Sequence, residues 1–449
     1  MQPASSGRRR FHLTVPIKFA LACAIALAWL LFSIILSRPW MQGLSEATHP
    51  LFALVAITFI AYVPGAMNAF LVASLLLDRR PRRYAPAVYP GVTVLIAAYQ
   101  EERAIATTIA TIAEEDYAGP LEVLILNDGS TDRTVALAQQ AIAALALPSN
   151  RQFRLIDYPV NQGKAAVLNL GLEHASHDLI VTIDGDSRLN PDALTDIVER
   201  ILSDPEGTAA VAGAILVRNS RESIMTGVQE WDYFHGIAAV KRMQSMYHGT
   251  LVAQGAFSIY RKQALIDVGG WPECVGEDIV LSWALLNRDH RIGYAEDAIA
   301  WTDAPATYKQ FAKQRHRWSR GMIEALNQYE VLLFKPRLSM MFIWWNLLFI
   351  PLDLAYTFLF FPGVIAAVFF GIYWIAGPMT LAVLPLAAVW NIIIYRIQSK
   401  MFKKQGLKVR HNPLGFVVYL FFYTLMMQPI CVWGYVSEIL SLRKTWGTK

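Results

Sequence analysis

Long apolar runs near the two ends of the chain enclose a middle segment of ordinary polarity. The runs cover residues 17–36, 51–77, 340–376, 379–395 and 414–440. Apolar stretches of about 20 residues are typical of helices that cross a membrane. We therefore predict a multi-pass membrane protein that carries a soluble domain between its second and third apolar runs.

The middle segment alternates short apolar runs with polar stretches of helix length. Strands are expected at residues 92–97, 121–126, 154–157 and 179–183, and crossover helices are expected to begin near residues 102, 132, 164 and 191. Strands joined in this way form a parallel sheet, whose ligands bind at the carboxyl ends of the strands. Polar residues follow all four strands, at 99–102, 127–130, 161–164 and 184–186. The pattern predicts an α/β domain with a ligand site at that edge.

Basic residues beside the apolar runs predict the orientation in the membrane. Arg8 to Arg10 precede the first run and Arg79 to Arg83 follow the second, whereas the loop between these runs holds a single arginine, Arg38. By the positive-inside rule, the N-terminus and the soluble domain lie in the cytoplasm. A signal peptide is the alternative for the first run, but its length and the lack of a small-residue cleavage site favour a retained span.

The C-terminal runs leave the number of crossings open by one. The basic loop at residues 396–411 is expected on the cytoplasmic side, which implies two crossings between residues 340 and 395 and five in the whole chain. Arg443 and Lys444 favour a cytoplasmic C-terminus. Prolines within these runs permit breaks or re-entrant pieces.

Composition narrows the possible functions. Hydrophobic residues make up 55% of the 449 residues and charged residues only 17%, which is too apolar for a purely soluble protein. The net charge of +5 is modest, and the basic residues gather beside the apolar runs, so nucleic acid is not an expected partner. The three cysteines, Cys23, Cys274 and Cys431, have neither a metal-ligand nor a disulfide spacing, which fits a reducing compartment for the soluble domain.

Asp184 and Asp186 are the clearest candidates for chemistry. They flank Gly185 at the end of an apolar strand, so their carboxylates emerge together with no side chain between them. Paired hard oxygen ligands suit Mg²⁺ or Mn²⁺ bridging a diphosphate. The same sequence is also common in plain turns after strands.

Six short motifs follow one another along the chain. They are Val94 to Glu102, Asn127 to Asp132, Gly163-Lys164, Asp184-Gly185-Asp186, Gly276-Glu277-Asp278 and Gln314 to Trp318. Together they resemble the membrane-embedded, processive members of glycosyltransferase family 2, which include cellulose, chitin, hyaluronan and poly-β-1,6-N-acetylglucosamine synthases. Each motif is weak, but their order and their place between membrane spans make the set specific. The stretch from Gly276 to Trp283 is most similar to the bacterial poly-N-acetylglucosamine synthases.

Two departures from the family pattern stand out. The first motif has Ala97-Ala98-Tyr99-Gln100 where Pro-Ala-Tyr-Asn is usual, which changes little. Gln254-Gly255 replaces the usual Ser-Gly and leaves the contacts to the acceptor open.

The resemblance implies a GT-A fold, which is a Rossmann-like nucleotide-sugar-binding domain, inserted between transmembrane helices. It implies Asp278 as the catalytic base and Asp186 as the ligand of Mg²⁺ or Mn²⁺, although Asp184 and Asp186 could exchange roles. The residues implied for nucleotide-sugar binding are Ala98, Tyr99, Glu101, Asp128, Lys164, Asp184, Gln314, Arg317 and Trp318. A single base without a neighbouring carboxylate nucleophile suggests in-line displacement with inversion.

Several of these residues also have simpler interpretations. Asp128 lies in an Asp-Gly turn, and Lys164 is a cation at a helix start. Asp278 opens an expected helix at 279–287, where a carboxylate is a common cap, although the preceding loop at 270–276 is punctuated by Gly and Pro and could present Asp278 to a cleft.

Residues 311–322 have the spacing of an amphipathic helix. One interpretation is a helix that lies on the membrane surface. The other is that Arg317 or Arg315 meets the diphosphate while Trp318 stacks on the acceptor sugar. Both interpretations can hold together, and His316 is expected to be a contact residue rather than a catalyst.

We therefore divide the chain into four parts: residues 1–87 with two transmembrane helices, 88–304 as the cytoplasmic GT-A domain, 305–339 as interface helices, and 340–449 with about three transmembrane helices. The expected enzyme is a hexosyltransferase of the bacterial inner membrane that polymerises a UDP-sugar, with UDP-N-acetylglucosamine favoured, into a biofilm exopolysaccharide and helps to translocate it. The expected partners are the UDP-sugar, the growing polysaccharide, the lipid bilayer and a small membrane accessory subunit.

Three other functions share part of this pattern. A non-processive glycosyltransferase with a lipid acceptor shares the nucleotide and metal residues, and the motif from Gln314 to Trp318 argues against it. A synthase of the same family with a hyaluronan-, chitin- or cellulose-like donor is the second. A transporter is disfavoured, because it would not need an α/β domain with acidic strand ends and because charged residues that would mark an ion path are not distributed through the apolar runs.

Overall fold

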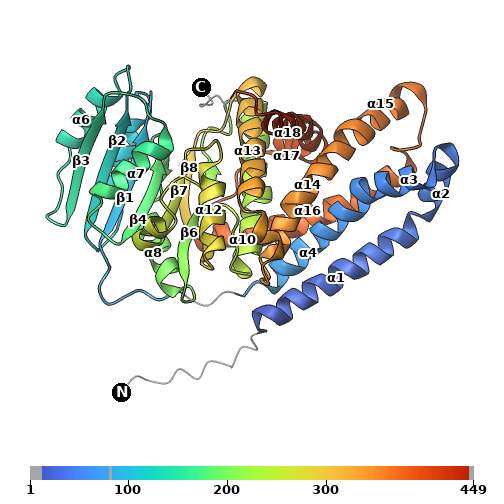
Figure 1. Ribbon diagram of the computed structural model, residues 1–449, viewed down its shortest axis with the longest axis horizontal. Coiled ribbons are helices and arrows are strands. Elements are labelled where there is room, and N and C mark those ends of the chain that lie inside the picture. The colour runs from blue at the N-terminus through green and yellow to red at the C-terminus, as the bar shows by residue number, and fades with distance from the viewer. Residues whose placement is uncertain (1–12, 80–82, 444–449) are drawn as a thin grey trace.

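A mixed sheet of eight strands forms the core of the soluble domain in the computed structural model, which describes residues 13–79 and 83–443. The strands lie in the order β3-β2-β1-β4-β7-β6-β8-β5 (Figure 1). Their bounds are β1 Val92–Ala98, β2 Leu121–Asp128, β3 Arg151–Tyr158, β4 Leu179–Asp184, β5 Arg188–Leu189, β6 Thr208–Val217, β7 Phe257–Arg261 and β8 Arg291–Thr302. The four predicted strands, β1 to β4, pair in parallel, whereas β7 runs antiparallel to β4 and β6. The predicted α/β fold is confirmed, and the sheet is mixed rather than purely parallel.

Helices cover both faces of this sheet, so alternate side chains of its strands enter two separate cores. Ile96 of β1 belongs to the core that contains residues of α5 and α8, and its neighbour Leu95 belongs to the core that contains residues of α7 and α12. The helices of the domain are α5 Ile105–Ala113, α6 Thr134–Ala143, α7 Lys164–His174, α8 Ala193–Ser203, α9 Ile224–Trp231, α10 Ala238–Met246, α11 Lys262–Asp267 and α12 Glu277–Asn287, with the π-helical segment η2 Asp232–Ile237 between α9 and α10. The four expected crossover helices are α5 to α8.

The apolar runs form a bundle of helices beside the domain (Figure 1). Its first half consists of α1 Val15–Leu36, α2 Arg38–Ala47, α3 Pro50–Ile57, η1 Thr58–Tyr62 and α4 Val63–Leu77. After α13 Tyr308–Gln328 and η3 Glu330–Phe334, the second half consists of α14 Met340–Ala355, η4 Tyr356–Phe360, α15 Phe361–Phe370, α16 Pro378–Lys404, α17 Pro413–Phe421 and α18 Tyr423–Ile439. Helices α2 and α15 lie at the end of the bundle that is far from the sheet (Figure 1).

Within the described residues, three helical segments are long and apolar enough to cross a membrane: Val15–Leu36, Pro50–Leu77 and Met340–Phe370. Helices α17 and α18 form a fourth candidate if this pair, bent by 52°, is one span. Helix α16 contains the predicted run at 379–395 but is not among these candidates, so the count of five crossings stays a prediction. The topology signals at Arg8 to Arg10, at residues 80–82 and at Lys444 lie outside the described residues.

An aromatic cluster joins the domain to the bundle. The ring of Tyr247, just after α10, lies 5.7 Å from that of Phe70 in α4 and 5.9 Å from that of Phe342 in α14, measured between centroids. The hydroxyl groups of Tyr247 and Ser74 are 2.9 Å apart. One of the two cores of the sheet thus continues into the apolar helices.

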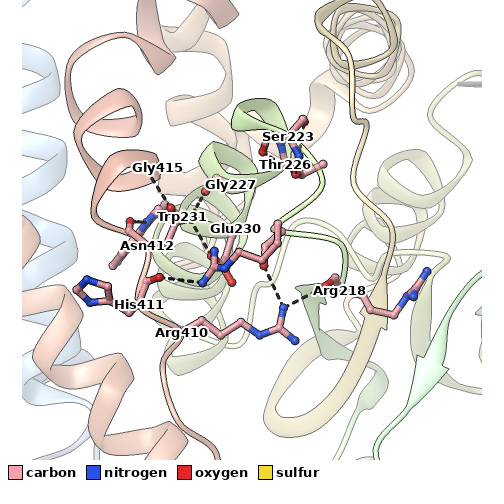
Figure 2. A network of polar contacts seen from close by, with 12 residues as sticks. Arg218, Ser223, Thr226, Gly227, Glu230, Trp231, Arg410, His411, Asn412 and Gly415 are labelled. Atoms are coloured by element: carbon pink, nitrogen blue, oxygen red, sulfur yellow. Dashed lines mark hydrogen bonds and ion pairs between the residues drawn. The ribbon is translucent and has the colours of Figure 1, made fainter.

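The basic loop between α16 and α17 lies against the soluble domain. The Nδ2 of Asn412 donates to the carbonyl of Gly227 and to Oε2 of Glu230, each at 2.8 Å (Figure 2). Arg410 donates to the carbonyl of Arg218 at 3.0 Å. Because the loop contacts the domain directly, the two would lie on the same side of a membrane if the candidate helices cross one. This agrees with the expectation that the basic loop and the domain share one compartment.

Replacing Asn412 by alanine should release this loop. Its Oδ1 accepts the N–H of Gly415 at 3.0 Å and caps α17, and loss of such a cap costs about 1 kcal/mol. We expect faster tryptic cleavage at the basic residues of the loop in detergent-solubilised protein. His411→Ala is the matched control, because the side chain of His411 is exposed. Equal cleavage rates for the two variants would contradict the role of Asn412.

Candidate active site

The carboxyl ends of three neighbouring strands form one wall of the candidate site. Ala98 of β1 pairs with Asn127 of β2, and Asp184 ends the other neighbour of β1, strand β4. The predicted residues Tyr99, Asp128 and Asp184 therefore meet at one edge of the sheet. Tyr99 is exposed, whereas Ala98 is buried.

Asp128 organises the loop that leads into α7. Its carboxylate accepts the backbone N–H groups of Gln162 at 2.7 Å and Gly163 at 3.0 Å, and it also accepts from Nδ2 of Asn161 at 3.0 Å. The side chain is only 3% exposed. The following residue must be glycine, because φ at Gly129 is +67° and an added Cβ would lie 2.4 Å from the nitrogen of Asn161. The described contacts are thus structural, and direct contact of Asp128 with a nucleotide stays a prediction.

Lys164, the first residue of α7, joins two carboxylates from distant parts of the chain. Its Nζ donates to Oδ1 of Asp184 at the end of β4 and lies 3.7 Å from Oε1 of Glu277 at the start of α12. Burial lowers the pKa of Lys164, but the attraction of Asp184 and Glu277 outweighs it and holds this pKa above its ordinary value. Lys164 is therefore a fixed cation at the centre of the site.

The carboxyl group of Glu277 has a pKa above its ordinary value. Burial raises the pKa of its carboxyl group, while Lys164 acts in the opposite direction and Asp278 adds to the rise. Gly255 provides the space for the lysine, because an added Cβ there would lie 2.6 Å from Nζ of Lys164. Gln254 replaces the usual serine of the family pattern, but the glycine that leaves room for Lys164 is kept at position 255.

Asp186 lies two residues beyond Asp184 and can hold a divalent metal ion. Its Oδ1 lies 3.5 Å from the hydroxyl of Thr302 in β8. A side chain at Gly185 would crowd Glu101, because an added Cβ would lie 3.1 Å from its Cγ. Among the described residues there is no group of three His, Cys, Asp or Glu side chains that could enclose a metal. The donor set still fits Mg²⁺ or Mn²⁺, since such ions are often held by one or two carboxylates together with substrate phosphates.

Asp278 lies in the first turn of α12, where Gly276 is the N-cap residue. Its side chain is half-buried. The hydroxyl of Ser282 donates to the carbonyl of Asp278 at 2.7 Å and accepts the N–H of Ala253 at 2.8 Å. Gly276 has no side chain with which to cap the helix, and Oδ1 of Asp278 itself accepts the N–H of Ile279 at 2.8 Å. The role of Asp278 as the base stays a prediction.

Two of the three arginines of helix α13, Arg315 and Arg317, were predicted to face the diphosphate, and their surroundings differ. Arg315 is 3% exposed, donates to Oδ2 of Asp232 at 2.8 Å and stacks over the ring of Trp318 at 3.9 Å. Arg317 lies close enough to Glu277 to lower the pKa of that carboxyl group. Of the two arginines considered for the diphosphate, Arg315 is committed to a buried ion pair, so Arg317 is the remaining candidate. The contact of Arg317 with the diphosphate stays a prediction.

The other predicted residues of α13 divide between core and surface. The side chain of Gln314 is partly buried, and its Oε1 is a buried atom without a hydrogen-bond partner among the described residues. Trp318 is 40% exposed, as a residue that receives a sugar would need to be. The ring of His316 contacts the hydroxyl of Ser437 at 3.0 Å, which agrees with its expected role as a contact residue.

Lys241 of α10 is an ionisable residue near the site that the sequence did not reveal. It is partly buried, and its Nζ donates to the carbonyl of Val252 at 3.0 Å. Burial lowers the pKa of Lys241 to about 7, and the nearby carboxylate of Asp278 only partly opposes this. In the sequence Lys241 is followed by Arg242, and two adjacent basic residues are typical of a helix face exposed to solvent.

Lys241→Met should change how stability depends on pH. The folded protein releases this proton at about pH 7, whereas an ordinary lysine has a pKa of 10.5, so the wild type gains stability as the pH rises between these values. We expect the variant to melt at a higher temperature than the wild type below about pH 7, and this difference to shrink towards about pH 10. Lys309→Met, at an exposed position, is the control. A pH-independent difference would exclude a buried neutral lysine.

Comparison with known proteins agrees with this geometry. Residues 93–269 match the family described as glycosyl transferase family 2. The chain is 34% identical to the poly-β-1,6-N-acetyl-D-glucosamine synthase of Staphylococcus aureus strain COL and 33% identical to that of Staphylococcus epidermidis, in each case over 237 residues. These matches cover 53% of this chain and 55% of the relatives, so the chain spans about half the length of the curated relatives that it matches.

The fold is shared with a solved mannosyltransferase from Pyrobaculum calidifontis, whose structure contains GDP-Man and Mn²⁺. The two chains are 19% identical and align with a TM-score of 0.60, covering 87% of this chain and 99% of the other. The mixed sheet with its acidic strand ends is therefore a GT-A-like fold, as expected. Residues 93–269 of this chain form a glycosyltransferase family 2 domain.

Proposed function

We propose that this protein is an inverting, processive β-glycosyltransferase that polymerises a UDP-sugar at the carboxyl edge of its sheet. The observation that carries the proposal is the cluster in which Lys164 joins Asp184 to Glu277. It brings a fixed cation and the strand-end carboxylates next to the helix start that holds Asp278. A donor diphosphate, a metal ion and a base are the parts that such a transfer needs.

In the proposed reaction, the acceptor hydroxyl oxygen bonds to the anomeric carbon of the donor. The bond between that carbon and the diphosphate oxygen breaks, and UDP leaves with the electron pair. Asp278 takes the proton of the hydroxyl. The guanidinium of Arg317 supports the departing diphosphate, and Lys164 keeps Asp184 and Glu277 in place. Displacement from the opposite face converts an α-linked donor into a β-linked product.

A divalent ion bound by Asp186 would neutralise charge on the diphosphate. Asp184 is paired with Lys164, which favours Asp186 as the ligand and Asp184 as the supporting residue. The structure of the Pyrobaculum calidifontis mannosyltransferase contains Mn²⁺. For this chain we propose either Mg²⁺ or Mn²⁺.

UDP-N-acetylglucosamine is the proposed donor. The support is the name of the staphylococcal relatives, since a fold does not select a sugar. A donor such as those of hyaluronan, chitin or cellulose synthases is the alternative. In either case Tyr99, Glu101 and Asp128 lie at the edge where the nucleotide is proposed to bind.

Processive synthesis is proposed from the position of α13. This helix follows the domain and precedes α14, so a sugar stacked on Trp318 would lie between the site and the apolar bundle. A polar chain needs a protein-lined path, because unpaired hydroxyls in hydrocarbon cost several kcal/mol each. We place the enzyme in the bacterial inner membrane with its domain in the cytoplasm, and a small accessory membrane subunit belongs to the same proposal.

Paired variants test the assignment of base and metal ligand. Asp278→Asn should retain UDP binding to within about twofold and lose transfer by about 100-fold or more, because the base acts only in the transition state. Asp186→Asn should instead abolish the increase in UDP affinity that Mg²⁺ or Mn²⁺ produces. Isothermal titration with UDP and turnover assays measure both. Loss of UDP affinity in Asp278→Asn would remove Asp278 from the role of base.

Product analysis tests polymerisation. Sealed vesicles that expose the domain outward are incubated with single UDP-sugars, and the product is analysed for linkage, length and protection from added glycosidase. We expect long β-linked chains from UDP-N-acetylglucosamine and shorter ones from Trp318→Ala. Trp433→Ala, at another exposed tryptophan, is the control. A lipid carrying one sugar as the wild-type product would favour the non-processive alternative.

A further inference from the structure

The loop that precedes Asp278 is held by a carboxylate from another helix. Oε2 of Glu324 in α13 accepts the N–H of Gly276 at 2.9 Å, and Oε1 accepts the N–H of Val275 at 3.3 Å. Glu324 is only 9% exposed. Hydrogen bonds to an ionised acceptor are about twice as strong as neutral ones. The start of α12 is therefore fixed by α13, and both helices lie beyond residues 93–269, which match the family.

Backbone contact between two glycines brings the helices close enough for these bonds. An added Cβ at Gly321 would lie 2.7 Å from Cα of Gly276, and one at Gly276 would lie 2.5 Å from Cα of Gly321. The atoms that would collide are backbone atoms, so the clash could be relieved only by moving one helix away from the other. Gly276 is also the residue whose N–H bonds to Glu324.

Arg317, Gly321 and Glu324 are spaced by four and three residues, so they lie on one face of α13. This face is turned towards the start of α12 along its length, since Arg317 acts on Glu277 and the other two residues contact Gly276. The helix that carries Trp318 thus also supports the segment that carries Asp278.

We propose that Glu324 is a positioning residue for Asp278. Glu324 holds the start of α12 through its two hydrogen bonds to the backbone, at the point where Gly276 and Gly321 are in contact. It thereby sets the distance between the carboxylate of Asp278 and the acceptor hydroxyl. This inference rests on the proposed function in that it takes Asp278 as the base. A displacement of the α12 start by a fraction of an ångström slows the transfer step and leaves the strand-end residues of the nucleotide site in place.

Glu324→Gln provides the direct test, because the amide offers one acceptor oxygen where the carboxylate offers two. We expect kcat to fall by about tenfold or more, with the KM for the donor and the affinity for UDP within about twofold of the wild type. Gly321→Ala should show the same pattern without any change of charge. Glu330→Gln is the matched control, since it makes the same substitution at an exposed position a few residues further along.

Thermal melting of each variant separates positioning from loss of fold, because the rate is compared only where the protein is folded. An unchanged kcat in Glu324→Gln, or a loss of UDP affinity equal to the loss of kcat, would overturn the proposal. Asp278→Asn is measured alongside. If that variant is inactive while Glu324→Gln is normal, the positioning role alone is wrong; if Asp278→Asn remains active, the proposed base is wrong.

Discussion

The ion cluster around Lys164 is the interaction on which the arrangement of the site depends. Asp184, Lys164 and Glu277 come from a strand end, a helix start and a second helix start that is more than 100 residues further along the chain. Their side chains are 12–34% exposed, so each charge lies partly out of water and is stabilised by its partners. The attraction of one cation for two carboxylates therefore links the end of β4 to the starts of α7 and α12.

The cluster also explains why neighbouring positions are constrained. The amine of Lys164 passes over Gly255, where a side chain would collide with it. The loop that delivers the lysine is held by Asp128, whose carboxylate is satisfied by backbone groups. A motif residue can thus matter for the nucleotide site without touching a nucleotide, because it determines where the lysine is placed.

The alternation of apolar and polar segments predicted the first four strands of the sheet, because such strands depend on nearby residues. The strands β1 to β4 and their polar ends follow from alternation of apolar and polar segments. The other half of the sheet was not predicted. In that half β7 runs antiparallel between β4 and β6, and such pairing depends on segments far apart in the chain. Helical spacing could not distinguish Arg315 from Arg317. The difference comes from Asp232, which lies 83 residues before Arg315. Lys241 was missed because its surroundings are also set by distant segments.

The contact of α13 with the start of α12 has a consequence for how this enzyme can be divided and inherited. A fragment that ends at residue 304 would keep the sheet, Lys164 and the acidic strand ends, but it would lose Glu324 and Gly321. On the proposed role of Glu324, such a fragment would be a nucleotide binder with a misplaced base. Exchange of domains between related enzymes would then preserve activity only if the crossover point lay beyond α13. The interface helix would accordingly evolve with the catalytic domain rather than with the membrane helices that follow it.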